Sequence, residues 1–203
     1  MTRRTFLVAL PAAAALLAWR SPMVEAAQDL EWVRAWERAQ RDRPKTLTAR
    51  ARIVPAAEPG TPLVIHGRLF ARDGRTPLPD VTVFAYHTDR HGRYDEPANG
   101  PHSWRLRGWA RSGADGRFTF DTIRPGVYPN RTTPAHVHVT IDGPTLLRRW
   151  TPELNFADDT LVGREARAAS AAAGVFGPVR PVEVRDGVHH VEFTLRVVDE
   201  GRF

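Results

Sequence analysis

The chain is 203 residues long, with 42% hydrophobic and 26% charged residues and a formal net charge of +6. These values are typical of one globular domain with short appendages. Lys45 is the only lysine, and the arginines that supply the remaining basic charge are scattered between acidic residues. Because no basic block is interleaved with aromatic residues, we expect no nucleic-acid partner. The chain has no cysteine, which excludes disulfides, iron–sulfur clusters, thiolate metal sites and cysteine nucleophiles.

The first 26 residues have the features of an export signal. Arg3 and Arg4 stand just before a Phe-Leu pair, and an alanine-rich apolar stretch runs from Phe6 to Trp19. That stretch is shorter than the roughly 20 apolar residues that span a bilayer, and small residues allow cleavage after Ala26. Paired arginines before Phe-Leu are typical of twin-arginine export. We expect residues 1–26 to be a signal peptide, leaving a periplasmic or extracellular protein without a membrane segment; a cytosolic N-terminal helix is the alternative.

A helical arm is predicted next, within residues 27–52. From Gln28 to Arg43 the apolar residues recur with a helical period, and Pro44 ends the run. The apolar positions are Leu30, Val33, Trp36 and Ala39. The apolar face of such a helix must be covered. We expect the main body of the same chain to cover it, and a partner subunit in a homodimer is the alternative.

Residues 60–198 are predicted to form short strands separated by glycine and proline turns. The expected strands are 63–71, 81–86, 105–110, 117–120, 135–141, 182–184 and 188–198. Asp115-Gly116 and Asp186-Gly187 are hairpin signals, and Asp73-Gly74 marks a turn. An alanine-rich stretch between Thr151 and Gly177 predicts one helix bracketed by loops. Strands at this spacing predict a mainly β fold, an antiparallel β-sandwich.

His136 and His138 are the most informative residues. Because side chains of a strand alternate between its faces, residues two apart place both imidazoles on one face. Tyr128 precedes them in a Pro-Gly-x-Tyr turn, and Tyr94 ends an earlier Gly-Arg-Tyr. Two imidazoles and two phenols would give a pocket with two nitrogen and two oxygen donors. Phenolate oxygen is hard and anionic, so the pattern predicts mononuclear ferric iron.

The chain from His66 to Phe156 resembles the intradiol ring-cleavage dioxygenases, the family of the catechol and protocatechuate dioxygenases. The motifs that carry the resemblance are Gly67-Arg68-Leu69, Asp73-Gly74, Pro79-Asp80-Val81-Thr82-Val83, Gly92-Arg93-Tyr94, Arg107-Gly108, Asp115-Gly116-Arg117-Phe118, Thr122-Ile123-Arg124-Pro125-Gly126-Val127-Tyr128 and Pro134-Ala135-His136-Val137-His138. Prealbumin-like sandwiches without a metal share the glycine turns. The tyrosine of Gly-Arg-Tyr and the spaced histidines separate the two groups.

The resemblance implies a non-haem Fe(III) held by Tyr94, Tyr128, His136 and His138, with Tyr128 as the axial tyrosinate that leaves when substrate binds. It implies intradiol cleavage of a small aromatic diol by O2, both atoms of which enter a muconate-type diacid. No electron-donating cofactor is needed, in agreement with the absence of a Gly-x-Gly-x-x-Gly phosphate loop. Members of the family commonly dimerise through N-terminal helices, so a homodimer is possible here.

Two positions depart from the family pattern. The family has Arg-Pro before its first histidine, whereas this chain has Thr133-Pro134. We expect Arg131, two residues earlier, to supply the missing charge as a catalytic residue, since losing one electrostatic donor costs about 10²–10³ in rate in other enzymes. Glu153 stands where a glutamine is expected. It is predicted either to disfavour an anionic substrate nearby or to act as a base.

Other interpretations of the same residues stay open. A cupin-like Fe(II), Mn or Zn site would combine histidine with Asp142, and a three-histidine zinc site would add His66 or His102. A non-catalytic, prealbumin-like binding module would only pack its tyrosines, as we expect for Tyr86.

Further residues have weaker expectations. His66, His87, His91 and His102 are expected to lie at the surface or in hydrogen bonds. Trp104, Trp109 and Trp150 are expected in the core or around a pocket for an aromatic ring. The loop between Tyr94 and Arg107 is expected to influence substrate size.

Overall fold

The computed structural model describes residues 30–94, 104–198 and 202–203. The predicted signal peptide, residues 1–26, lies outside this range, and so does most of the predicted loop between Tyr94 and Arg107. Of the helices within the described range, none is long and apolar enough to cross a membrane.

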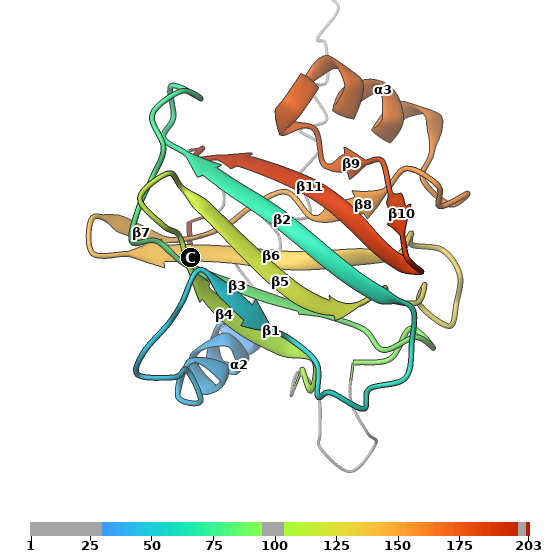
Figure 1. Cartoon of the computed structure of the whole chain (residues 1–203), viewed down its shortest axis with the longest axis horizontal. Coiled ribbons are helices and arrows are strands. Elements are labelled where there is room, and N and C mark those ends of the chain that lie inside the picture. The colour runs from blue at the N-terminus through green and yellow to red at the C-terminus, as the bar shows by residue number, and fades with distance from the viewer. Residues whose placement is uncertain (1–29, 95–103, 199–201) are drawn as a thin grey trace, which may run out of the picture.

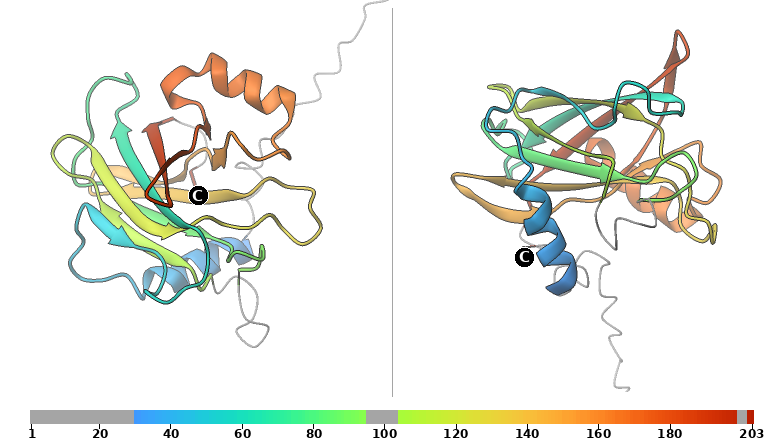
Figure 2. Two further views of the ribbon diagram at one scale, coloured as in Figure 1. Left: turned by 45° about the vertical axis from the view of Figure 1, so that its right-hand side comes forward. Right: turned by 90° about the horizontal axis from the view of Figure 1, so that it is seen from below.

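Two sheets pack face to face (Figures 1 and 2). The first has the order β1 (Arg50–Arg52), β5 (Arg117–Ile123), β2 (Pro62–Phe70), β11 (Val188–Arg196) and β10 (Glu183–Arg185). The second has the order β4 (Arg107–Arg111), β3 (Thr82–His87), β6 (His136–Gly143), β8 (Leu154–Phe156) and β9 (Val179–Arg180), and β7 (Leu146–Trp150) also pairs with β6. Outside the sheets lie the helices α2 (Leu30–Gln40) and α3 (Arg164–Ala172) and the 3-10 turn η2 (Gly174–Phe176). The predicted mainly β sandwich is confirmed.

The pairing within the sheets is mixed rather than wholly antiparallel. β1 runs parallel to β5, β2 to β11 and β8 to β9, while the other described pairs are antiparallel. Parallel neighbours need a long connection between them. Turn signals between consecutive strands therefore do not reveal such pairs.

One of the two predicted hairpins is wrong. Asp115-Gly116 leads from β4 to β5, and these strands lie in different sheets, so this turn carries the chain from one layer to the other. Asp186-Gly187 does close a hairpin between β10 and β11. The turn at Asp73-Gly74 is also present, because Asp73 Oδ1 accepts from the backbone N–H groups of Arg75 and Thr76, both at 2.9 Å. An Asp-Gly pair fixes a reversal of the chain, but the side chains buried beyond it decide which sheet the next strand joins.

Short strands were the hardest elements to predict. Helix α3 lies in the predicted stretch between Thr151 and Gly177, but so does β8, and β1 lies within the predicted arm. The sequence pattern also does not reveal β7 and β9. These four strands have between two and five residues, which is too short for an alternating pattern to stand out.

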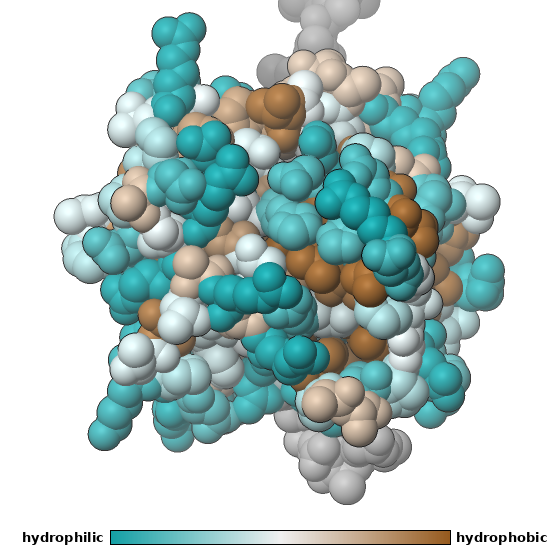
Figure 3. Space-filling view, viewed as in Figure 1, coloured by the Kyte–Doolittle hydropathy of each residue, from teal (hydrophilic) through white to brown (hydrophobic). Residues whose placement is uncertain are grey.

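Alternating side chains of both sheets fill the space between them. In β2, Leu63, Ile65 and Leu69 are buried, and the residues between them are partly exposed or glycine. They belong to one apolar cluster with Val83 of β3 and Val139 of β6 from the second sheet. The face shown in Figure 3 is mainly hydrophilic, with apolar side chains visible between polar ones. Burial of apolar surface, worth roughly 25 cal/mol per Å², holds the two sheets together.

The second sheet is also covered on its outer face. All residues of β3 are buried, and Phe84 and Tyr86 point away from the core into an aromatic cluster with α2. Trp32 Nε1 of this helix donates to Tyr86 Oη at 3.2 Å, and Trp36 Nε1 donates to Thr140 Oγ1 of β6 at 2.9 Å. The expectation that the arm packs on its own main body is confirmed. The helix thereby excludes water from part of the outer face of β3 and β6.

His87, at the end of β3, is fully buried. Its Nε2 lies 2.6 Å from Thr122 Oγ1 of the opposite sheet, and its Nδ1 lies 2.7 Å from the carbonyl oxygen of Thr88. Burial lowers the pKa of His87 from 6.5 to about 4. Below pH 6.5 the unfolded chain takes up a proton that the folded protein does not accept until about pH 4. Stability contributed by the neutral imidazole is therefore lost as the pH falls through this window.

We predict that the free energy of unfolding decreases by up to roughly 3 kcal/mol through His87 as the pH falls from 6.5 to about 4. Replacing His87 by glutamine should remove most of this dependence, because the amide does not titrate. Urea unfolding at about pH 7, 5.5 and 4.5 measures it. His91→Gln, at an exposed histidine, is the control. Equal pH dependence of the wild type and the His87 variant would contradict the assignment.

Candidate metal centre

The two histidines lie on the outer face of β6. Val137 and Val139 face the core between the sheets, so the alternation of the strand turns His136 and His138 to the opposite side. Tyr86 of β3 pairs with His138 in the sheet register, and their rings are stacked with centroids 4.6 Å apart. The imidazole of His138 is therefore held in one orientation by a buried phenol ring.

Two glycines bring the tyrosines together. Gly92 has a φ of +78°, and a Cβ there would lie only 1.8 Å from the carbonyl oxygen of Val127. Gly126 is also tightly packed, since a Cβ there would lie 2.5 Å from the carbonyl oxygen of Arg90 in the facing loop. Only glycine allows two loops to touch this closely. Because each tyrosine follows its glycine by two residues, this contact delivers Tyr94 and Tyr128 to the same place.

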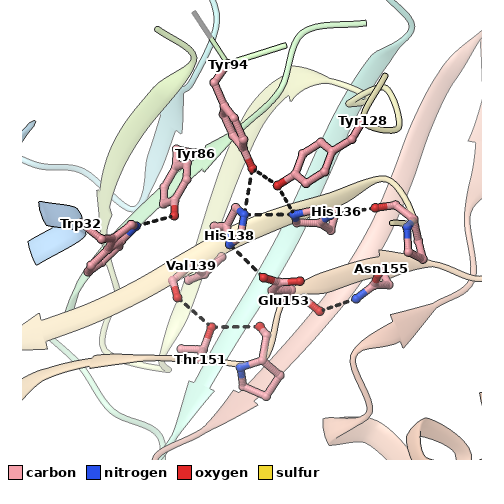
Figure 4. Close-up of polar contacts among 12 residues, drawn as sticks. Trp32, Tyr86, Tyr94, Tyr128, His136, His138, Val139, Thr151, Glu153 and Asn155 are labelled. Atoms are coloured by element: carbon pink, nitrogen blue, oxygen red, sulfur yellow. Dashed lines mark hydrogen bonds and ion pairs between the residues drawn. The ribbon is translucent and has the colours of Figure 1, made fainter. Parts of the chain in front are cut away.

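Four polar atoms form a closed ring (Figure 4). Tyr94 Oη lies 2.7 Å from Tyr128 Oη, which lies 3.1 Å from His136 Nε2. His136 Nε2 lies 2.9 Å from His138 Nε2, and His138 Nε2 lies 2.8 Å from Tyr94 Oη. The four predicted ligands, from two loops and one strand, thus meet at one point.

The far nitrogens of both imidazoles face acceptors. His136 Nδ1 lies 2.7 Å from the carbonyl oxygen of Pro134 and so carries the proton of its ring. His138 Nδ1 lies 3.0 Å from Glu153 Oε1 and, although the ring is turned off the ideal hydrogen-bond line, it has no closer partner. In neutral rings of this kind both Nε2 atoms present lone pairs. Two lone pairs at 2.9 Å repel each other, and a cation bound among the four atoms relieves the repulsion.

Burial acts on the charge states in the same direction. It raises the pKa of Tyr94 well above its ordinary value, raises the pKa of Tyr128 and lowers the pKa of His136. Without a cation, the phenols therefore stay protonated and His136 stays neutral at physiological pH. Coordination to a metal ion instead favours the phenolate form. The four side chains are therefore better explained as ligands of a bound cation than as charged groups that pair with one another.

Two ligand sets share the histidines. His136, His138 and Glu153 lie within reach of one ion, with one atom of each within 4.8 Å of the others, as in a histidine–carboxylate site for Fe(II). Glu153, however, contacts the Nδ1 edge of His138, whereas Tyr94 contacts its Nε2 edge. The set of two Nε2 atoms and two phenol oxygens is therefore the better fit, and its hard oxygens favour ferric iron.

The other predicted site residues lie apart from this ring. Arg131 is exposed, and its guanidinium makes no hydrogen bond or ion pair within the described residues. Asp142 pairs with Arg43 at 3.3 Å and is not in the group within reach of one ion. His66 lies in the first sheet, 3.1 Å from His190, and His102 lies outside the described residues. The structure therefore does not assemble the cupin-like set with Asp142 or a site with His66.

An aromatic pocket of about 180 Å³ adjoins the ring of donors. Its described lining residues are Trp32, Tyr86, Tyr94, Trp104, Tyr128, His138 and Trp150. Trp104 and Trp150 thus line a pocket, while Trp109 packs on Phe84, with ring centroids 5.1 Å apart. The sequence pattern gives no sign of Trp32, because its place depends on how α2 docks. A larger hollow of about 430 Å³ beside Leu147 shares no lining residue with the ring of donors.

Comparisons with known proteins relate the chain to dioxygenases. A family model described as dioxygenase matches residues 38–197. The chain is 28% identical over 151 residues to catechol 1,2-dioxygenase 2 of Acinetobacter lwoffii. The aligned region covers 66% of this chain and 54% of that protein. It is 35% identical over 101 residues to 6-chlorohydroxyquinol 1,2-dioxygenase of Cupriavidus pinatubonensis. This alignment covers 42% of this chain and 36% of that protein. The chain thus spans about half, or less, of the length of these relatives.

Solved structures show the same fold. The dioxygenase domain of a dioxygenase carbohydrate-binding protein fusion from Streptomyces sp. SirexAA-E matches with a TM-score of 0.55 at 28% identity, over 76% of this chain and 90% of that one. An intradiol ring-cleavage dioxygenase from Tetranychus urticae matches in fold with a TM-score of 0.55 at 15% identity, over 79% of this chain and 91% of that one. Fold and site define a β-sandwich with a mononuclear set of two imidazoles and two phenols. The chain belongs to the intradiol ring-cleavage dioxygenase family.

We predict that Gly126→Ala separates the two tyrosines, because the added Cβ overlaps the facing backbone. Iron affinity should fall by roughly tenfold or more, the usual cost of disturbing the support of metal ligands. Iron analysis of the purified protein, with circular dichroism to verify folding, measures this. Gly163→Ala is the control, since a Cβ there meets nothing within 4 Å. A folded Gly126 variant with wild-type iron affinity would refute the role of this contact.

Proposed function

We propose that the protein is a non-haem iron dioxygenase that cleaves a single-ring catechol between its two hydroxyl-bearing carbons, giving a muconate-type diacid. Tyr94, Tyr128, His136 and His138 would hold the Fe(III). The observation that carries this proposal is the convergence of two phenol oxygens and two imidazole nitrogens at 2.7 to 3.1 Å. Family membership supports the reaction class, and two relatives are dioxygenases of catechol and of 6-chlorohydroxyquinol by name.

Bound Fe(III) would supply Lewis acidity that takes up the deprotonated diol and activates its ring toward O2. Among the residues of the chain, Tyr128 is placed to accept a proton. Burial raises the pKa of its phenol, so a Tyr128 phenolate would readily take up a proton of the diol at Oη. Tyr128 lies in a loop after β5, whereas His136 and His138 are fixed in β6. Tyr94 lies in a loop as well, and it is the resemblance to the family that makes Tyr128 our proposal for the donor that moves aside.

The aromatic pocket supports a small, uncharged ring as the substrate. Its volume of about 180 Å³ is below the roughly 300–1,000 Å³ of sites for drug-sized ligands. Tyr94, Tyr128 and His138 belong both to the lining and to the proposed ligand set, so a ring in the pocket lies against the metal site. The indole and phenol faces around it provide stacking surfaces and exclude water. Within the described lining no side chain carries a fixed charge, which favours a ring without charged substituents.

Arg131 stays our proposal for the positive charge that Thr133 lacks. Its backbone N–H donates to the carbonyl oxygen of Tyr128 at 2.8 Å, and its φ is +53°. The residue therefore lies at a tight turn next to the tyrosine that is proposed to move. A guanidinium carried by this turn would stabilise negative charge that develops on the ring during cleavage.

Export and assembly are proposed as well. The paired Arg3 and Arg4 and the apolar stretch after them support a twin-arginine signal in residues 1–26 and a periplasmic or extracellular mature protein. A homodimer through α2 is proposed from the resemblance to a family whose members commonly dimerise through N-terminal helices.

The purified protein is expected to contain iron and to be red-brown from charge transfer between tyrosinate and Fe(III). Tyr128→Phe should move this band and lower the rate of ring cleavage by roughly 10²-fold, because one phenolate and one proton acceptor are lost. Visible spectra, iron analysis and release of diacid from catechol measure the effects.

Tyr86→Phe is the spectroscopic control, because Tyr86 Oη bonds Trp32 and is not part of the ring of donors. A colourless wild-type protein without iron would refute the proposed function and favour a non-catalytic binding module.

We predict that Trp32→Leu widens the pocket and raises KM for catechol several-fold, since one stacking surface of about 1 kcal/mol is lost. The KM for bulkier, alkylated catechols should rise less than the KM for catechol, or fall. Trp36→Leu is the matched control, because Trp36 lies one helical turn later on α2 and is equally buried, but does not line the pocket. Steady-state kinetics over a series of substituted catechols provides the measurement. Identical substrate profiles of the two variants would show that Trp32 does not shape the site.

A further inference from the structure

The two imidazoles of the proposed metal centre have different supports. His136 Nδ1 faces a neutral group, the carbonyl oxygen of Pro134 at 2.7 Å. His138 Nδ1 faces the carboxylate of Glu153 at 3.0 Å. A carboxylate beside the outer nitrogen of a histidine ligand favours the tautomer with the proton on that nitrogen and makes the ligand a stronger donor. The site is therefore asymmetric, and the asymmetry comes from one side chain.

The segment that carries Glu153 is anchored on both sides. The backbone N–H of Thr151 donates to the carbonyl oxygen of Val139 at 3.1 Å, which ties the segment to β6. The side-chain amide of Asn155 donates to the carbonyl oxygen of Glu153 at 3.1 Å. Figure 4 shows the carboxylate held beneath the ring of His138 by this frame. Its place beside the imidazole is thus set by the fold.

Glu153 has no other charged partner within the described residues. Its one ion pair is with His138, and its side chain is 35% exposed, so water screens it only in part. Pairs with arginine neutralise several other acidic side chains of this protein, for example Glu58, which pairs with Arg105. The negative charge of Glu153 is therefore directed at the metal site rather than cancelled beside it.

The charges of the site balance when Glu153 is counted. Two tyrosinates and one carboxylate carry three negative charges, which equal the charge of a ferric ion. A glutamine in place of Glu153 would leave the ferric site with an excess positive charge. In a partly buried site such a charge is costly, because a low local dielectric strengthens every interaction. The balanced arrangement favours Fe(III) over Fe(II).

We propose that Glu153 is a positioning residue that fixes the Nε2 of His138 toward the metal and supplies the charge that stabilises the ferric state. This inference rests on the proposed function. It replaces the prediction that Glu153 acts as a base, because the carboxylate lies on the Nδ1 edge of His138 and is not in the lining of the aromatic pocket. It also gives a reason for an acid at a position where the family has a glutamine.

Glu153→Gln tests the charge, because the amide keeps an oxygen beside Nδ1 and removes only the negative charge. The variant should bind iron, but its Fe(III)/Fe(II) midpoint potential should be higher than that of the wild type. Its tyrosinate band should move to longer wavelength, since a more electron-poor ferric ion lowers the charge-transfer energy. Glu153→Ala, which loses the acceptor as well, should also lose roughly tenfold or more in iron affinity.

Glu37→Gln is the matched control, because Glu37 is an acid of helix α2 that pairs with Arg148 at 3.0 Å, away from the donors. Its potential and band should equal those of the wild type. A coloured Glu153→Gln protein with unchanged potential and band would overturn the inference and leave the proposed function intact. A wild-type protein that binds no iron and shows no tyrosinate band would overturn both.

Discussion

The constraint on which the rest of the structure depends is the convergence of the polar atoms of Tyr94, Tyr128, His136 and His138 at one point. Their four polar atoms lie 2.7 to 3.1 Å apart in a half-buried place. Burial holds the phenols protonated and His136 neutral, so the side chains alone do not neutralise one another. The phenols can donate to the imidazoles, but the 2.9 Å approach of His136 Nε2 to His138 Nε2 joins two nitrogens that a shared cation would bind together.

The support comes in three parts with different mechanical properties. Strand β6 fixes the histidines in a sheet that is buried on both faces. The contact between the loops of Gly92 and Gly126 places the tyrosines, and a loop is free to move in a way that a central strand is not. Helix α2 closes the outer side through Trp32, which also shapes the pocket. Rigid nitrogen donors and a mobile oxygen donor suit a site that must admit a substrate.

The two departures from the family pattern change the charge near the site in different ways. Arg131 is our proposal for the positive charge that Thr133 lacks, whereas Glu153 adds a negative charge where the family has a neutral glutamine. The added negative charge would favour a ferric ion and disfavour an anionic ring substituent. The uncharged aromatic lining of the pocket points to the same kind of substrate.

The sequence by itself determined the ligand candidates, the sandwich class, helix α2 and the turns, because these depend on local chemistry: the period of two along β6, the helical period before Pro44 and the Asp-Gly pairs. Tertiary structure decided what depends on distant partners. The turn at Asp115-Gly116 crosses between sheets, since the next strand, β5, pairs with β2 in the first sheet. Trp32 and Glu153 reach the site only through the docking of α2 and of the segment before β8, contacts between residues 54 positions apart for Trp32 and Tyr86. Such contacts cannot be recognised from a repeating pattern in a single sequence, because each depends on how two distant segments pack against each other.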